Sequence, residues 1–159
     1  MCFWFFPVKI INRKARYNYE FLEKFEAGIV LTGAEVKSVK KGQIRLDEAF
    51  VRIDPNGEVW LTNVHIHPYE FADNKNYQPT RSRKLLLHKK EILSLAKKME
   101  GRNLTMVPVS CYTKRGVIKL ELALAKGKKK WEKKEKIKKR DIEREMERDL
   151  NRPTPSVGR

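Results

Sequence analysis

The chain has 159 residues, with 36 Lys and Arg against 20 Asp and Glu, and therefore a net charge of +16 at pH 7. This length allows about one domain with one buried core, and this charge predicts a polyanionic partner, nucleic acid ahead of an anionic membrane. Two cysteines exclude a disulfide framework, and no apolar run reaches the roughly 18 residues of a membrane span, so we expect a cytoplasmic protein with no membrane partner.

The first eleven residues, MCFWFFPVKII, are apolar but lack the basic start and the small-residue cleavage site of a secretory signal. We expect an atypical leader over residues 1–11, which either pairs as a strand or reflects a misassigned start. Residues 19–31, YEFLEKFEAGIVL, are rich in aromatic and branched side chains and predict a strand. The glycine inside this run predicts that the strand bends or bulges near Gly28.

Residues 32–42, TGAEVKSVKKG, predict a short helix. Thr32 and Glu35 have the spacing of a capping box, and Gly42 supplies the left-handed residue that ends a helix. Val36 and Val39 form one narrow apolar stripe between lysines. Because two turns are too short to be stable alone, we expect this helix to cover a sheet.

Two hairpins and a second helix are expected in the following part of the chain. In EAFVRIDPNGEVWLTNVHI, the turn residues DPNG place Gly57 where a positive φ is needed. In HKKEILSLAKKMEG, Glu91 follows His88 by three residues, apolar residues recur at helical spacing, and Gly101 ends the helix. Two further strands flank the turn KRG in LTMVPVSCYTKRGVIKLELALAKG.

These elements predict a fold that is mainly β with short helices. About five or six antiparallel strands, joined as hairpins with a helix inserted between them, are typical of a small closed or half-closed barrel. The sequence therefore predicts an antiparallel β-barrel of the oligonucleotide-binding type, followed by a basic C-terminal tail.

The chain contains His and Cys residues, which often take part in catalysis, but their spacing does not match a known catalytic or metal site. His65 and His67 lie two apart, hence on one face of a strand, but no third or fourth metal ligand with credible spacing accompanies them. Cys111 falls inside the strand VPVSCYT, where a small buried residue is ordinary. With no glycine-rich phosphate loop, nucleophile elbow or paired carboxylates, the sequence predicts a binding protein and not an enzyme, with no metal and no cofactor.

Cations stand beside aromatic or apolar side chains in three places. NRKARYNYEF places Arg13, Lys14 and Arg16 beside Tyr17 and Tyr19, and TRSRKLLLHKK places Arg81, Arg83 and Lys84 before three leucines. KGKKKWEKKEKIKKR contains ten basic and two acidic residues. Cations neutralise phosphates, and exposed rings stack on unpaired bases. A single such cluster is commonly a solvated surface, but three of them favour RNA.

The tail is too charged to fold alone, because its few apolar groups cannot offset an ordering cost of roughly 1 to 2 kcal/mol per residue. Lys and Glu nevertheless favour helices, and Ile142, Met146 and Leu150 recur every four residues. We therefore expect a tail over residues 127–159 that is disordered when free and helical when bound to a polyanion.

Seven segments, in this order, resemble the SmpB family, the bacterial SsrA-binding proteins: NRKARYNYEF, FEAGIVLTGAEVKSVKKG, DEAFVRI, HIHPYE, TRSRKLLLHKKEI, LTMVPV and KLELALAKGKKK. The resemblance runs from about Asn12 to about Leu150. It implies a monomeric adaptor whose barrel, residues 12–126, binds transfer-messenger RNA (SsrA RNA). Such adaptors bring the alanylated RNA, carried by elongation factor Tu, to ribosomes stalled on messages without a stop codon, which is the ribosome rescue called trans-translation.

The resemblance assigns RNA binding by the barrel to Asn12, Glu26, Leu86 and Lys119. Lys119 can neutralise phosphate, Asn12 and Glu26 can bond base edges or 2′-hydroxyls, and Leu86 offers an apolar face to an unstacked base. For two of these residues a structural role is the alternative, Leu86 as part of the core and Glu26 as an ion-pair partner on a strand.

For the ribosome, the resemblance implies that Tyr17 faces the decoding centre and that the tail enters the empty message channel. Tyr17 stands where the family usually has His, and WEKK stands where it usually has an aromatic residue followed by Asp, Lys and Arg. Lys in place of Arg gives up bidentate phosphate geometry. The implied channel residues are Lys126, Gly127, Lys128, Lys129, Trp131, Glu132, Lys133, Ile137, Ile142 and Met146.

Two alternatives from other classes stay open. An RNA nuclease or modifying enzyme would need a site built on His65, His67 or Cys111. A ribosomal structural protein would share the basic barrel and tail, but it would copurify with all ribosomal particles. The RNA that copurifies with the chain separates these possibilities, because the adaptor should bring one small structured RNA.

Overall fold

The computed structural model describes residues 8–100 and 102–150, and the chain divides into one unit that ends at Gly127 and another that begins at Lys128. The division into domains at 12–126 and 127–159 stays a prediction. None of the described helices is both long enough and apolar enough to cross a membrane. The strands are β1 (Lys9–Ile11), β2 (Tyr19–Ile29), β3 (Ile44–Arg45), β4 (Phe50–Ile53), β5 (Val59–Thr62), β6 (His65–Ile66), β7 (Arg83–Leu86), β8 (Leu104–Lys114) and β9 (Val117–Gly127). The helices are α1 (Arg13–Asn18), α2 (Gly33–Lys40), α3 (Lys89–Met99) and α4 (Lys130–Leu150).

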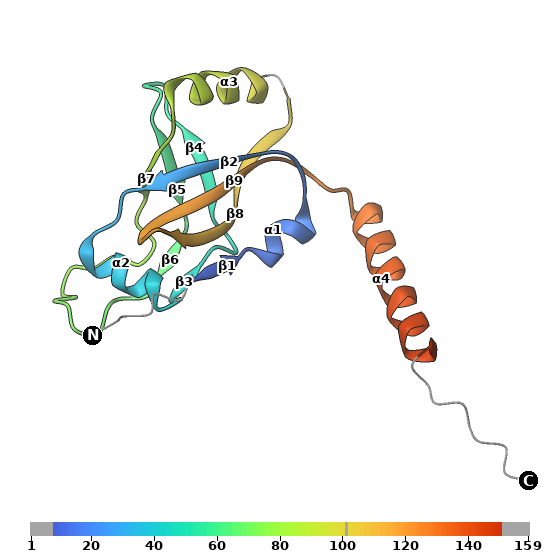
Figure 1. Cartoon of the computed structure of the whole chain (residues 1–159). Coiled ribbons are helices and arrows are strands. Elements are labelled where there is room, and N and C mark those ends of the chain that lie inside the picture. Colours follow the sequence, from blue (N-terminus) through green and yellow to red (C-terminus); the bar gives the residue numbers. More distant parts are fainter. Residues whose placement is uncertain (1–7, 101, 151–159) are drawn as a thin grey trace, which may run out of the picture. The chain divides into compact units, whose positions relative to one another are not determined.

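Seven of the described strands form one large antiparallel sheet, which pairs back onto itself where β9 meets β8 (Figure 1). Its order is β1-β8-β4-β5-β7-β2-β9, and β9 also pairs with β8, so six strands follow one another in a ring. A second small sheet pairs β3 with β6. The prediction of a mainly β, antiparallel fold with short helices is confirmed, although the described chain has more strands than the five or six expected.

The main core is a cluster of buried apolar side chains contributed by the strands, helices and loops. Leu61, Met106, Leu120 and Leu122 are fully buried there, and Leu95 of α3 packs onto the same cluster. β8 buries six consecutive residues, because its other face is covered as well. On that face, Ala15 of α1, Val107 and Ala125 form a second small core. In Figure 1, α3 lies at one end of the strands and α2 at the other.

Three local predictions are confirmed by the backbone geometry. The Thr32 hydroxyl accepts a hydrogen bond from the Glu35 N–H at 3.4 Å, and the Glu35 carboxylate accepts one from the Thr32 N–H at 2.9 Å. Gly42 and Gly57 have φ of +79° and +75°, as their turns require. The second hairpin turns through Arg115 and Gly116, both with positive φ, between β8 and β9.

The bulge predicted at Gly28 is at another position. Phe21 pairs with Ala125 and Glu23 with Leu124, so Leu22 is the extra residue of β2. Gly28 instead lies between two regularly paired neighbours, and a Cβ there would come within 3.3 Å of the Leu86 Cβ. The glycine is therefore explained by the close approach of β7.

The structure also bears on the predicted leader, on the end of the second predicted helix and on one helix that was not predicted. Residues 9–11 of the expected leader pair as β1 with β8, which puts Ile10 opposite Cys111, while residues 1–7 lie outside the described part. Gly101, the expected end of the second predicted helix, also lies outside it, and α3 ends at Met99. The sequence did not predict α1, which has only six residues.

Candidate nucleic-acid interface

Three of the four residues assigned to RNA binding in the barrel line one hollow of about 290 Å³: Glu26 of β2, Leu86 of β7 and Lys119 of β9. The strand register explains why they meet. Gly28 pairs with Leu86 on one side and with Lys119 on the other, and Glu26 lies two residues earlier on the same face. Because Gly28 has no side chain, the space between its neighbours stays open.

A structural role was the alternative to RNA binding for Leu86 and Glu26, and the structure supports this alternative for Glu26 but not for Leu86. Leu86 has 56% of its surface exposed, so it is not part of the core. Glu26 does act as an ion-pair partner, because its carboxylate contacts the ammonium of Lys119. Lys114 lies 3.8 Å from the same carboxylate. The hollow therefore presents an apolar surface beside a group of charges.

Hydrogen bonds fix the charge state of Glu26. Its carboxylate accepts from Lys119 and from the Tyr112 hydroxyl, and these two bonds hold the pKa of Glu26 below its ordinary value. Burial, together with the bond to Glu26, raises the pKa of Tyr112 to about 12. At neutral pH the site therefore combines a carboxylate, a protonated phenol and an ammonium, which can bond base edges, sugar hydroxyls and phosphate respectively.

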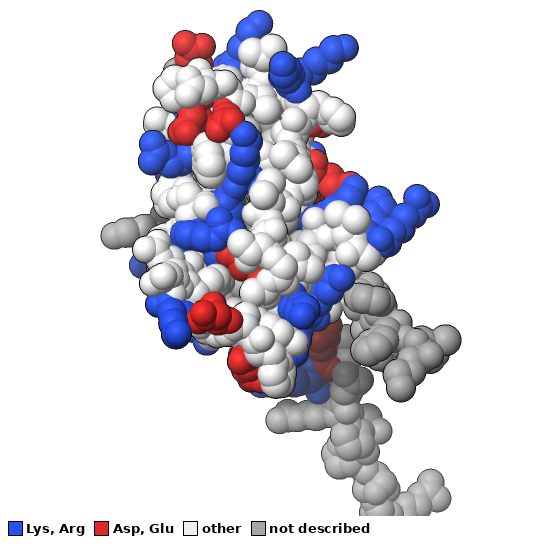
Figure 2. Space-filling model, turned by 90° about the vertical axis from the view of Figure 1, so that its left-hand side faces the viewer, with Lys and Arg blue, Asp and Glu red and all other residues white. Residues whose placement is uncertain are grey.

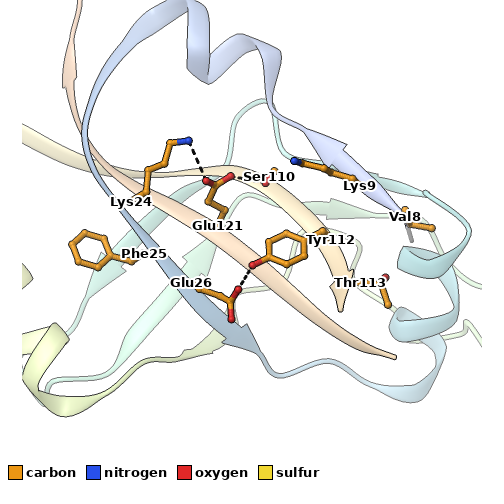
Figure 3. Close-up of a pocket in the computed structure, with 9 residues that line it drawn as sticks. All are labelled: Val8, Lys9, Lys24, Phe25, Glu26, Ser110, Tyr112, Thr113 and Glu121. Carbon is orange, nitrogen blue, oxygen red and sulfur yellow. Dashed lines mark hydrogen bonds and ion pairs between the residues drawn. The ribbon is translucent and has the colours of Figure 1, made fainter. Parts of the chain in front are cut away.

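A second hollow of about 540 Å³ adjoins the first one at Glu26 (Figure 3). In Figure 3 the Tyr112 ring points across this hollow toward Glu26. On the other side, Lys24 lies 3.1 Å from the Glu121 carboxylate, which also accepts from the Ser110 hydroxyl at 2.8 Å. Glu26 lines both hollows, so the charged group around Lys119 lies beside the second one as well. Tyr112 could not be identified from the sequence, because only the pairing of β8 with β9 brings it there.

Asn12 does not lie with the other three. Its side chain is buried, and its amide donates to the Leu46 carbonyl at 2.6 Å and to the Pro108 carbonyl at 3.1 Å. Its side-chain oxygen accepts from the Ala15 N–H at 2.8 Å and so caps α1. Both N–H groups of the amide are therefore occupied inside the protein, and a direct bond from Asn12 to RNA is not supported.

The cations of the segment TRSRKLLLHKK also serve the structure. Arg83 is completely buried and donates to the Glu35 carboxylate, to which Arg81 donates as well. Lys84 contacts Glu58. Arg81, Arg83 and Lys84 of this predicted RNA cluster are therefore all paired with carboxylates of the chain itself. Over the face drawn in Figure 2, Lys and Arg extend along the whole height of the molecule with Asp and Glu between them.

The predicted ribosome contacts lie at both ends of the described chain. Tyr17 is on α1, with 37% of its surface exposed. Lys126 and Gly127 end β9, opposite Glu20 and Tyr19 of β2. The Lys129 N–H donates to the Glu132 carboxylate at 3.0 Å, at the start of α4. Lys128 lies between β9 and α4.

Helix α4 is a charged helix with exposed apolar side chains: Trp131, Ile137, Ile142, Met146 and Leu150. The last three share one face, because they recur every four residues. The side chain of Lys133 lies outside the part of the structure that is described. The disorder expected of the free tail stays a prediction.

The residues considered as candidates for catalysis, His65, His67 and Cys111, are packed against other groups of the chain or buried. The rings of His65 and His67 meet edge to face, 4.7 Å apart, and burial lowers the pKa of His65. Burial also raises the pKa of the Cys111 thiol to about 12, so this thiol is protonated at neutral pH. Within residues 8–100 and 102–150, no group of three or more His, Cys, Asp or Glu side chains could hold a metal ion.

A strongly basic antiparallel β protein, with an exposed leucine, a carboxylate and an ammonium around one hollow, has the features of a nucleic-acid-binding protein. The chain belongs to the SmpB protein family, whose model matches residues 9–152.

Individual relatives agree with this family. The chain is 55% identical to the SsrA-binding protein of Sulfurihydrogenibium sp. (strain YO3AOP1), over 77% of this chain and 80% of that protein. It is 52% identical to the SsrA-binding protein of Carboxydothermus hydrogenoformans, over 77% and 81%. A solved structure described as "tmRNA-SmpB: a journey to the center of the bacterial ribosome" matches with a TM-score of 0.64 and 46% identity, over 77% of this chain and 85% of that one.

Proposed function

We propose that this chain is an RNA-binding adaptor that binds transfer-messenger RNA and delivers it to stalled ribosomes for trans-translation. The observation that carries the proposal is the meeting of Glu26, Leu86 and Lys119 around one hollow. These residues come from three strands and were assigned to RNA binding by family resemblance alone. Residues that contact the same part of an RNA must lie on one surface, and these three do.

The ring of six strands supports a barrel of the oligonucleotide-binding type, since a sheet that pairs back onto itself encloses its core. In this proposal Lys119 exchanges its contact with Glu26 for a phosphate. Leu86 then packs against an unstacked base, and Glu26 bonds a base edge or a 2′-hydroxyl. Asn12 acts indirectly, by holding α1 against the barrel.

The tail enters the empty message channel as a helix, and Tyr17 faces the decoding centre. The charge and the apolar face of α4 support this role, because a polyanionic channel neutralises the cations that repel one another in the free tail. Elongation factor Tu contributes through the alanylated RNA. The adaptor acts as a monomer in the cytoplasm, where ribosomes are found, and performs no chemistry of its own.

The test is a gel shift of transfer-messenger RNA with the full chain and with Lys119→Ala, over a range of salt concentrations. We expect weaker binding by Lys119→Ala and a salt slope that is smaller by about one, because one phosphate contact is lost. Lys97→Ala on α3 removes the same charge from an exposed position outside the hollow and should bind as the wild type does. Equal binding and equal slopes for all three proteins would contradict the proposed site.

The identity of the RNA is tested by copurification. A single small structured RNA, bound to the chain in cell extracts, supports the adaptor. Stoichiometric recovery with every ribosomal particle would instead favour a ribosomal structural protein.

A further inference from the structure

A second group of cations and aromatic rings lies on α2 and on the loop between β6 and β7. We name it the α2 patch; it consists of Lys37, Lys41, Tyr69 and Phe71. Figure 1 shows this loop beside α2, at the opposite end of the strands from α3. Figure 2 views the molecule from the left-hand side of Figure 1, the side on which α2 is drawn. The patch contains no residue of the hollow that Glu26, Leu86 and Lys119 line.

In the patch, two aromatic rings lie next to each other with lysine ammonium groups over them. The rings of Tyr69 and Phe71 meet edge to face, with centroids 5.6 Å apart and an interplanar angle of 62°. The ammonium of Lys37 lies 5.1 Å from the Tyr69 centroid, and that of Lys41 lies 4.9 Å from it. Lys41 is also 5.7 Å from the Phe71 centroid. These are cation–π distances, and they hold the two lysines close together over the rings.

The groups of the patch are available to a ligand. Phe71 has 81% of its surface exposed. Among the described ion pairs, Lys24, Lys84 and Lys119 each contact a carboxylate, whereas none of these pairs includes Lys37 or Lys41. The cationic charge of the patch is therefore not cancelled by a carboxylate in direct contact.

The loop that carries the rings is held in place by its own hydrogen bonds. The Asn74 amide donates to the Tyr69 carbonyl at 2.9 Å, and the Tyr77 hydroxyl donates to the Ile66 carbonyl at 3.0 Å. Glu70 and Asp73 belong to the same loop and are exposed, so they reduce the local positive potential without pairing with the two lysines in the described contacts. A ligand must therefore gain from stacking as well as from charge.

We propose that the α2 patch binds an unpaired nucleotide of RNA. The base stacks on the exposed ring of Phe71, and Lys37 and Lys41 bind its phosphates. An unpaired nucleotide matches both features, since every base has an apolar face and every nucleotide adds a negative charge. A paired A-form helix would offer phosphates but no free base face to this ring. The patch thus adds a second RNA contact, on another part of the surface from the proposed transfer-messenger RNA site.

The direct test uses the full chain and an oligouridylate of ten nucleotides, one of which is 4-thiouridine. Irradiation followed by peptide mass spectrometry should place a cross-link on Tyr69 or Phe71. In equilibrium binding, Phe71→Ala should weaken affinity for oligouridylate by about fivefold or more, the lower range for loss of one stacked base. Phe71→Trp keeps a stacking face and should retain the affinity. Because Phe71 is exposed, neither change disturbs the core.

The charge of the patch is tested separately. Lys37→Ala with Lys41→Ala should lower the salt slope for oligouridylate by about one or more. Arg52→Ala with Lys97→Ala removes the same charge from exposed positions on β4 and α3 and should change the slope less.

Unchanged affinity of Phe71→Ala, together with cross-links only outside the β6–β7 loop, would overturn the proposal. So would a Phe71→Ala variant that binds RNA normally but loses contact with a ribosomal protein, because the patch would then bind protein. Lys119→Ala keeps the patch intact, so failure of the proposed transfer-messenger RNA site gives a different pattern from failure of the patch.

Discussion

At the residue scale, Glu35 takes part in two sets of interactions. Its capping box with Thr32 is local, and the spacing in the sequence predicts it. The same carboxylate, which is buried, also accepts from Arg81 at 2.9 Å and from Arg83 at 2.8 Å and 3.0 Å. Arg83 donates further to the carbonyl of Val64. One carboxylate thus connects the start of α2 to the segment that leads into β7.

This network predicts a pH dependence of stability. Burial raises the pKa of Glu35, but bonds from Arg81, from the Thr32 backbone and from Arg83 outweigh it and lower the pKa from 4.5 to about 2. Since the folded pKa lies below the unfolded one, the contribution to stability is present above about pH 4.5 and is lost as the pH falls toward 2. Between pH 5.5 and pH 3 the free energy of unfolding should fall by about 2 kcal/mol through this group.

Urea unfolding at the two pH values, for the wild type and for Glu35→Gln, measures this contribution. The glutamine variant is less stable at pH 5.5, and it should lack the part of the pH dependence that Glu35 causes. The same loss of stability in both proteins would show that Glu35 is not the titrating group.

Asn12 gives a second prediction at this scale. Asn12→Ala removes the cap of α1, which costs about 1 kcal/mol, and leaves the buried carbonyls of Leu46 and Pro108 without donors, which costs about 1 to 3 kcal/mol more. We expect the urea midpoint to fall strongly, while the affinity of the folded variant for transfer-messenger RNA changes by less than the effect of Lys119→Ala. Asn12→Asp is the matched variant, because it keeps the cap acceptor and loses both donors. A large loss of affinity for RNA without a loss of stability would instead support a direct bond between Asn12 and the RNA.

Residues with local roles were predictable, and residues with distant partners were not. Thr32, Gly42 and Gly57 act within a few positions, so spacing alone identifies their roles. Arg83 was taken for an RNA contact because its partner Glu35 lies 48 positions away. Asn12 was assigned to RNA by the family resemblance, and nothing in its sequence neighbourhood shows that its side chain bonds the Pro108 carbonyl, 96 positions away.

At the scale of elements, α2 was predictable because nearby residues define it, whereas α1 was not because it depends on distant partners. α2 has both a cap and a glycine stop in its own sequence. α1 has six residues, fewer than an isolated helix needs, and it is stabilised by the packing of Ala15 on Val107 and Ala125. The bulge of β2 likewise depends on its pairing with β9, which the glycine in the sequence could not reveal.

The tail carries the prediction at this scale. If α4 acts as a helix in the channel, Ile137→Pro should abolish peptide tagging on truncated messages, because proline within a helix costs about 3 kcal/mol or more. Binding of transfer-messenger RNA and recruitment to ribosomes should stay largely intact. Ile137→Ala keeps the helix and removes only the side chain, so it separates the two contributions. A reconstituted translation assay measures tagging.

A scrambled tail of the same composition is the second variant, because it keeps the charge and loses the apolar face of Ile142 and Met146. Normal tagging by this variant would show that the tail is only an electrostatic tether. The free tail should give random-coil amide shifts by NMR, and stable helical shifts without RNA would contradict the expected disorder.

At the scale of the whole molecule, the unit that ends at Gly127 contains the described sheet and its core. A chain that ends at Gly127 should therefore unfold at the same temperature as the full chain. It should also bind transfer-messenger RNA almost as tightly at moderate salt, since the hollow is intact. Calorimetry and a gel shift with linear competitor RNA measure both. Loss of specific binding would mean that the tail takes part in recognising the RNA.

The place of β9 between β2 and β8 has a consequence for how the protein is made. Translation proceeds from the N-terminus, so β9 is the last strand of this sheet to emerge, although β2, its partner, lies about a hundred positions earlier. Until then β2 and β8 each wait with an unpaired edge, and such edges associate with other chains. A message cut before the codons of β9 would thus yield a nascent chain prone to aggregate. Under the proposed function, the chain must therefore be made from intact messages of its own before it can act on ribosomes stalled on broken ones.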